Sequence, residues 1–173
     1  FSISTSNAPD LVRAADVLKS SWERLGAKVE VKVFEISDLN QNVIRTRKYD
    51  ALLFGEVVGR DPDPFAFWHS SQRNDPGLNI ALYTSTAADK LLEDARGLIS
   101  SEDRKKKYEE FQEIIQKDVP SIFLYSPSFI YIVEKNLLGF DTENIATPSE
   151  RFTNIYKWHF DTKYVWKILH KNN

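Results

Sequence analysis

A short apolar run followed by a broken segment places the strongest limits on how this chain can fold. The run Ala51–Phe54 lies between Asp50 and Gly55 and contains only apolar residues. Such a run is typical of a strand buried on both faces, so we predict that it forms the centre of a sheet. Residues 55–64 then hold two glycines and two prolines, which exclude regular structure. Open α/β sheets usually bind ligands where a buried strand ends in such a segment.

Strands and helices are predicted to alternate before this run. Residues 1–5 and 29–35 alternate between apolar and polar side chains, which indicates two strands. Apolar residues from Leu11 to Leu25 recur at helical spacing and stop at Gly26, and a weaker helix is predicted over 38–48. This order is typical of right-handed crossovers and a largely parallel sheet.

A helical part follows the broken segment. Phe65–Trp68 is predicted to form an aromatic helical turn, and residues 70–85 a polar loop on the surface or beside a cleft. Residues 87–98 and 101–119 have apolar faces at helical spacing, so two more helices are expected.

Additional strands are predicted near the C-terminus. Residues 121–125 and 129–133 are rich in β-branched and aromatic side chains and flank a Ser-Pro bend. Residues 152–160 alternate in a way that predicts a last strand or edge, and residues 165–169 are expected to dock as a short tail.

Composition excludes several classes of protein. A formal net charge of -2 gives no field that would attract nucleic acid, and the run Arg104–Lys107 is interpreted as a solvated helix face. The absence of cysteine excludes disulfides and thiolate chemistry, and no run of 18 apolar residues is present. The chain begins in strand-like alternation at Phe1 and contains no methionine, which suggests a piece of a larger protein.

Few residues offer catalytic or metal chemistry. Asp61 and Asp63 each precede a proline, where an aspartate more often caps a turn than acts as an acid or base. No histidine has a partner three or four residues later, and motifs for nucleotide cofactors are missing, so no metal, cofactor or catalytic residue is predicted. His69 is expected to be packed or to face a cleft. A hydrolase using Asp61, Asp63 and His69 stays open as an alternative, as does a non-catalytic interaction domain.

Four motifs in order resemble one known family. The segment Tyr49–Gly55 with Asp61–Phe65, the helices at Ala87–Arg96 and Arg104–Pro120, and the closing Phe152–Phe160 are similar to the extracytoplasmic solute-binding proteins of family 5. These proteins serve ABC importers of peptides, nickel and related solutes. Their members are longer and have two lobes that close on a ligand.

The resemblance implies a fold and a setting. Residues 1–173 would form a single ligand-binding lobe, the C-terminal one, with a periplasmic-binding-protein-like α/β fold and a possible return or edge segment at 150–173. The lobe would act outside the cytoplasm, in the periplasm or on the outer face of the cytoplasmic membrane, as in a lipoprotein whose anchor lies elsewhere. Its partners would be a small solute, the N-terminal lobe of the same protein and the ABC permease subunits.

The resemblance also implies a site after the central strand. Peptide-binding members hold the peptide amino terminus with an aspartate whose position here is Val58, which cannot pair with an ammonium group. Glu56 is a nearby substitute, and the ligand is left open between a peptide, a metal complex and a sugar. Glycines let the backbone approach the ligand, while charged and aromatic side chains pair and stack. The predicted ligand-binding residues are Gly55, Glu56, Val57, Val58, Gly59, Arg60, Asp61 and Trp68, and stacking by Trp68 competes with simple core packing.

Overall fold

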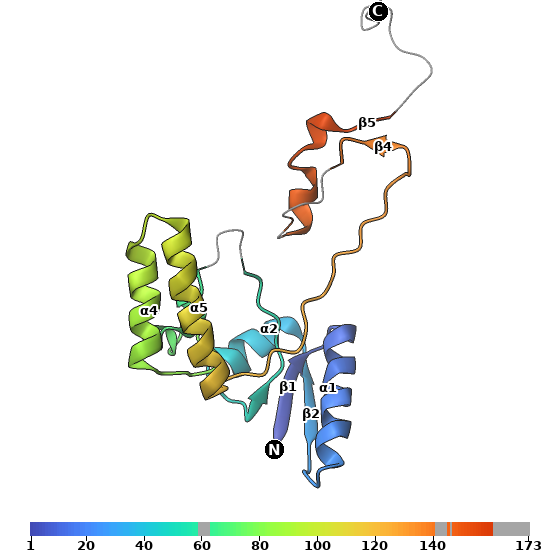
Figure 1. Ribbon diagram of the computed structural model, residues 1–173. Coiled ribbons are helices and arrows are strands. Elements are labelled where there is room, and N and C mark those ends of the chain that lie inside the picture. The colour runs from blue at the N-terminus through green and yellow to red at the C-terminus, as the bar shows by residue number, and fades with distance from the viewer. Residues whose placement is uncertain (59–62, 141–144, 146, 161–173) are drawn as a thin grey trace, which may run out of the picture. The chain divides into compact units, whose positions relative to one another are not determined.

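The chain forms two compact units in the computed structural model, which describes residues 1–58, 63–140, 145 and 147–160 (Figure 1). The first unit comprises Phe1–Val57 and Asp63–Ile122, and the second comprises Val58–Pro62 and Phe123–Asn173. The first unit contains a parallel sheet with helices, and the second contains a small antiparallel sheet.

Three parallel strands form the sheet of the first unit. They are β1 (Ser2–Ser6), β2 (Glu30–Phe34) and β3 (Ala51–Leu52), in the order β2-β1-β3. In this register Ile3 lies opposite Val31 on one side and Ala51 on the other. The predicted α/β fold with a mostly parallel sheet is therefore confirmed.

The prediction that residues 51–54 form the centre of the sheet is wrong. The middle strand is β1, in which all five residues are buried, whereas β3 pairs over two residues and Phe54 is 37% exposed. The hydroxyls of Ser2 and Thr5 can be buried because they have hydrogen-bond partners. Ser2 donates through its N–H and its hydroxyl to Asp50 Oδ2, both at 2.8 Å, and Thr5 Oγ1 donates to Leu53 O at 3.0 Å. A buried strand that contains so many polar residues cannot be recognised from apolar runs in the sequence.

Two helical segments connect these strands. Helix α1 (Pro9–Glu23) packs Ala15 with Leu11 and Leu18 against the sheet. Gly26 ends this part of the chain with a φ of 89°, as predicted, because the left-handed region suits glycine. The prediction that Leu25 belongs to the apolar face is wrong: it lies beyond the helix and is 84% exposed. The second segment consists of α2 (Ile36–Asp38) and the π-helix η1 (Leu39–Ile44).

The helical part of the first unit follows the predicted order. It consists of α3 (Phe65–Trp68), the 3-10 turn η2 (Ser70–Gln72), α4 (Thr86–Gly97) and α5 (Ser101–Asp118). Ser85 and Ser100 cap the two long helices, because their hydroxyls accept the N–H groups of Ala88 and Asp103. The predicted helices 87–98 and 101–119 thus differ from the observed ones only at their ends.

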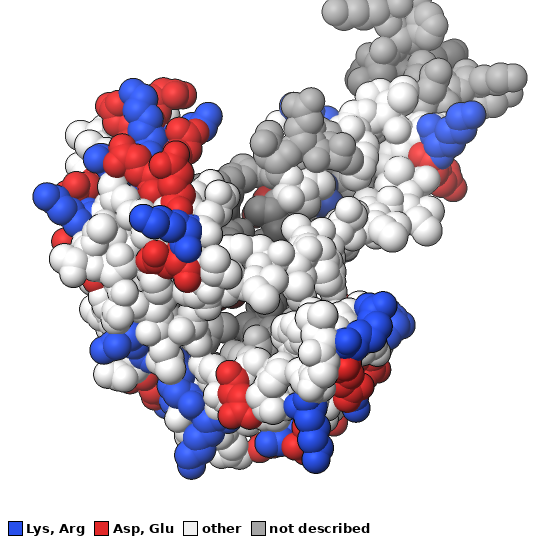
Figure 2. Space-filling model, turned by 60° about the horizontal axis from the view of Figure 1, so that its bottom comes forward, with Lys and Arg blue, Asp and Glu red and all other residues white. Residues whose placement is uncertain are grey.

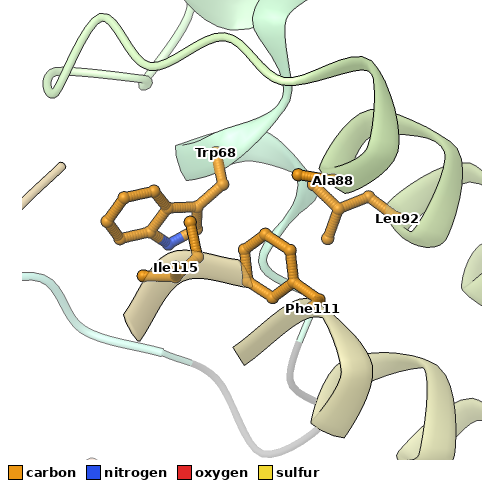
Figure 3. Packing of buried hydrophobic residues seen from close by; sticks show 5 residues of the cluster. All are labelled: Trp68, Ala88, Leu92, Phe111 and Ile115. Carbon is orange, nitrogen blue, oxygen red and sulfur yellow. The ribbon is translucent and has the colours of Figure 1, made fainter. Parts of the chain in front are cut away.

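One hydrophobic cluster joins three of these helices. Trp68 of α3 packs with Phe111 of α5 at 6.3 Å between ring centroids, in an edge-on arrangement. Figure 3 shows the side chains of the cluster directed toward one another from α3, α4 and α5. Its buried members are Trp68, Ala88, Leu92, Phe111 and Ile115.

The solvent side of α4 and α5 carries charges of both signs (Figure 2). Along α5, Lys105 lies 3.9 Å from Glu109, and Lys107 lies 3.5 Å from Glu110. The basic run at 104–107 is thus balanced by acidic neighbours on its own helix. This arrangement agrees with the interpretation of a solvated helix face.

The polar loop 70–85 is fastened by a buried side chain. Asn79 is fully buried, and its amide nitrogen donates to Trp68 O and His69 O at 3.2 Å and to Tyr83 O at 2.9 Å. Arg47 donates to Gly77 O at 2.7 Å on the same loop. The loop has little regular structure, yet hydrogen bonds fix its course.

The second unit holds β4 (Leu137–Leu138) and β5 (His159–Phe160), which pair in antiparallel fashion. The expected additional β-structure near the C-terminus is confirmed in this small sheet. Between the two strands lie the 3-10 turns η3 (Pro148–Phe152) and η4 (Ile155–Lys157).

Two of the three predicted C-terminal strands are wrong, and the third is correct only at its end. Residues 121–125 and 129–133 form no strand among the described residues and run as an extended trace in Figure 1. Residues 152–160 are mostly turns, and only His159–Phe160 belongs to a strand. A strand needs a hydrogen-bonding neighbour, and the aromatic side chains here pack around Arg151 instead. The predicted tail at 165–169 lies outside the described residues.

Candidate functional site

The segment after β3 is open to solvent. Leu53 N still donates to Ser4 O at 2.9 Å, and the chain then leaves the sheet. Residues 55–58 are all exposed, with 72% of Val57 and 48% of Val58 accessible. A Cβ built on Gly55 meets no atom within 4 Å. The first residues of the predicted ligand segment therefore follow a parallel strand and are not covered by helices.

Glu56 supplies an acidic side chain in this segment. Desolvation by the surrounding chain raises the pKa of Glu56, although much of its surface is exposed. Within the described part of the chain, Glu56 has no hydrogen-bond or ion-pair partner. A carboxylate in this situation is suited to a cationic group of a ligand.

Of the remaining predicted ligand-binding residues, the structure describes only Trp68. Gly59, Arg60 and Asp61 lie outside the described residues, and the two units meet in sequence between Val57 and Val58. Trp68 packs in the core cluster and is 9% exposed, which matches the packing role considered for it and leaves its ligand role a prediction.

Asp63 caps the turn that begins α3, as its position before a proline predicts. Its Oδ1 accepts the N–H of Phe65 at 3.2 Å, and its Oδ2 accepts Arg96 Nε at 2.8 Å and Nη2 at 2.6 Å. The Arg96 guanidinium also lies 3.8 Å from the centre of the Phe65 ring. Burial alone would raise the pKa of Asp63, but the hydrogen bonds from Arg96 and Phe65 and the charges of Arg96 and Arg104 outweigh it and hold that pKa below its ordinary value.

We expect Asp63→Asn to flatten the acid dependence of stability. A carboxyl with a lowered pKa stabilises the folded state above its ordinary pKa of about 4, and this contribution is lost as the pH falls through the lowered value. Because the pair with Arg96 is partly exposed, the loss at pH 7 should stay under about 1 kcal/mol. Melting curves between pH 3 and pH 7 measure it, with Asp94→Asn on α4 as the control. An unchanged acid slope in Asp63→Asn would contradict the assignment.

His69 is a packed histidine, as expected. It is 8% exposed and stacks on Phe65 at 4.1 Å between ring centroids. Its Nδ1 accepts the N–H of Ser71 at 3.1 Å, so the proton lies on Nε2, which donates to Glu93 Oε1 at 3.2 Å. Sequence reasoning missed the α4 carboxylates that face this turn, Glu93 and Asp89, because they lie about 20 residues away along the chain.

The geometry gives the hydrolase alternative no support. Ser71, His69 and Glu93 form a hydrogen-bonded series, but His69 caps the short η2 turn, because its Nδ1 accepts the N–H of Ser71. The N–H groups of Gln72 and Arg73 donate to carbonyl groups within that turn, so they cannot stabilise an oxyanion. The lowered pKa of Asp63 is also opposite to what a general acid requires.

The described residues contain neither a metal-binding cluster nor a membrane-spanning helix. The described part of the chain holds no group of three or more His, Asp or Glu side chains placed to bind a metal ion. None of its helices is both long enough and apolar enough to cross a bilayer. Two surface hollows border α1 and β2, and none of the predicted ligand-binding residues that the structure describes lines them.

Known proteins share this arrangement. No family model matches the chain. The oligopeptide-binding protein AppA of Bacillus subtilis is 30% identical to it over 145 residues, which are 83% of this chain and 26% of AppA. The structure of AppA in complex with a nonapeptide matches with a TM-score of 0.72 and 27% identity over 94% of this chain and 32% of that chain. NikZ from Campylobacter jejuni in complex with Ni(L-His) matches with a TM-score of 0.65 and 26% identity, over 91% and 32%.

These similarities identify the class of fold and the relatives of the chain. A parallel sheet flanked by helices, with an exposed segment after β3, is a periplasmic-binding-protein-like fold. The homologues and structural neighbours of this chain are solute-binding proteins of family 5, the family that its motifs resemble. It spans about a quarter to a third of the length of the relatives that it matches.

Proposed function

We propose that this chain is one ligand-binding lobe of a longer solute-binding protein that serves an ABC importer. The protein captures an oligopeptide-like solute between two lobes by hinge closure, without covalent chemistry and without a cofactor. The lobe comprises residues 1–173, and the other lobe and the permease subunits are its partners. Its place is extracytoplasmic, with any lipoprotein anchor outside this chain.

One observation carries the proposal. Residues 55–58 follow a parallel strand, are exposed, and bring a carboxylate without a partner among the described residues to the strand end. AppA, which shares this architecture, is an oligopeptide-binding protein seen with a nonapeptide. NikZ holds a nickel–histidine complex on a related fold, so a metal complex is the second ligand class to test. The proposed contacts are Gly55, Glu56, Val57, Val58, Gly59, Arg60, Asp61 and Trp68.

A thermal-shift screen of the full-length polypeptide tests the proposal. The probes are a degenerate nonapeptide library, nickel with L-histidine, and a set of oligosaccharides, and peptide hydrolysis is assayed in parallel. A rise in melting temperature with the peptide library and no turnover supports the proposal. Turnover that Asp63→Ala abolishes would favour the hydrolase instead. A shift with sugars alone would move the protein to another ligand class.

Glu56→Gln should weaken the binding of peptides that have a free amino terminus. The change keeps the size of the side chain but removes the charge that pairs with an ammonium group, and such charged hydrogen bonds contribute roughly 10- to 100-fold in affinity. Titration calorimetry compares free and N-acetylated peptides, with Glu113→Gln on α5 as the control. Equal losses for both peptide forms would show that Glu56 does not contact the amino terminus.

A further inference from the structure

The strand β2 lies at an edge of the parallel sheet, so one side of its backbone has no neighbour. The order β2-β1-β3 leaves it beside β1 alone, and among the described residues no other strand pairs with it. The N–H of Glu30 and the carbonyl of Phe34 bond to the chain at the two ends of β1, at 3.1 Å and 2.9 Å. Because backbone groups alternate in direction along a strand, those of Val31 and Val33 point away from the sheet, where another strand can pair with them.

The side chains at this edge are apolar on one face and charged on the other. The lining of the hollow between α1 and β2 includes four valines, Val12, Val29, Val31 and Val33. Val33 is 47% exposed, although it lies within a strand. Glu30 and Lys32 alternate with the valines of β2, so they lie on the opposite face, and both are exposed. The edge thus offers apolar surface on one face and one charge of each sign on the other.

Backbone direction and charge together select one way for two copies of β2 to pair. A two-fold axis makes the two strands antiparallel, and residues whose backbone groups point outward must then lie opposite each other. Three registers place Val31 opposite such a valine. If Val31 faces Val29, the two Glu30 side chains face each other, and if it faces Val33, the two Lys32 side chains do. Like charges directly opposite are destabilising. Only the register with Val31 opposite Val31 places each Glu30 opposite a Lys32.

We propose that the outer edge of β2 is a surface at which two copies of this protein associate, with Val31 opposite the partner's Val31. Glu30 then pairs with the partner's Lys32, and Lys32 pairs with the partner's Glu30. Charges on an edge strand usually prevent association, but here they have opposite signs and favour a single register. Because the strand is short, the dimer is weak. The inference goes beyond the proposed function and does not depend on which solute is bound.

Sedimentation velocity of the full-length polypeptide, without ligand, tests this surface. The wild-type protein should show a monomer–dimer equilibrium at concentrations up to about 1 mM, where a Kd as weak as about 1 mM is still visible. Glu30→Lys and Lys32→Glu each place like charges opposite each other, so each should weaken the dimer by at least about 10-fold. Lys90→Glu makes the same charge change at an exposed position of α4 and should leave the equilibrium unchanged.

Combining the two charge changes tests the register. The double variant with Glu30→Lys and Lys32→Glu again has opposite charges facing each other, so its Kd should return to within about 3-fold of the wild-type value. An equal mixture of the two single variants should form a mixed dimer, because one copy then brings two lysines and the other brings two glutamates. Both positions are exposed, so the melting curves of all variants should match that of the wild type.

Three outcomes would overturn the inference. The first is a wild-type polypeptide that stays monomeric up to about 1 mM. The second is a dimer that Glu30→Lys and Lys32→Glu leave intact, which would place the contact elsewhere on the protein. The third is a folded double variant that does not regain the dimer, with no mixed dimer of the single variants. All measurements are made without peptide, so they succeed or fail separately from the ligand screen that tests the proposed function.

Discussion

Phe111→Ala is expected to lower the free energy of unfolding by about 3–5 kcal/mol. Phe111 is 4% exposed and packs edge-on against Trp68, so truncation removes buried apolar surface and leaves a cavity between α3, α4 and α5. Urea unfolding followed by tryptophan fluorescence measures the loss, because Trp68 reports on this cluster. Ile99→Ala is the control, since Ile99 is 101% exposed and truncation there should cost less than about 0.5 kcal/mol.

A loss below about 1 kcal/mol in Phe111→Ala would contradict the position of the core. It would mean that the cluster in Figure 3 adapts to the lost ring, or that α4 and α5 are not held through it. A change in the denaturant slope without a change in the midpoint would contradict it as well, because that result reports on the unfolded chain instead.

Asn79→Ala should be nearly as destabilising, at about 2–4 kcal/mol. Its amide is fully buried, donates to three carbonyl groups and accepts the N–H of Tyr83 at 3.1 Å. Alanine leaves these main-chain groups buried without a partner, which costs more than the lost contacts alone. Urea unfolding gives the magnitude, and hydrogen exchange at the Tyr83 amide should become faster.

Asn74→Ala is the matched control, because Asn74 lies in the same loop but is exposed. It should change stability by less than about 0.5 kcal/mol. Equal effects at Asn74 and Asn79 would indicate that the loop is held by Arg47 and its neighbours instead of by the buried amide.

The helices and the class of fold were predictable because their signals are local. Ser85 and Ser100 cap their helices as side-chain chemistry requires, and Gly26 stops the first helix through its positive φ. Apolar residues at helical spacing identified the buried face of α4, including Leu92. Each of these features depends on residues within a few turns of one another.

The order of the sheet was not predictable in the same way. The burial of β1 depends on Asp50 and Leu53, which lie about fifty residues away and supply the acceptors for its hydroxyls. A single sequence shows the polar residues of β1 but not these partners. The apolar run before Gly55 was therefore predicted to be the central strand.

The irregular course of the candidate segment was predictable, and its role in ligand binding stays a prediction. The glycines and prolines of 55–64 indicated an irregular segment, and the structure leaves residues 55–58 accessible. Strands were wrongly predicted at 121–125 and 129–133 because strand propensity is realised only beside a partner, and Tyr131 packs on Arg151 instead of joining a ladder.

The hydroxyls of β1 also make the sheet selective about its own alignment. A shift of β3 by one residue would move Asp50 away from Ser2 and the Leu53 carbonyl away from Thr5, so a misaligned pair loses these bonds together. An all-apolar middle strand would tolerate such slippage with little change in burial. The polar side chains of β1 thus stabilise the native register of β3 over registers shifted by one residue.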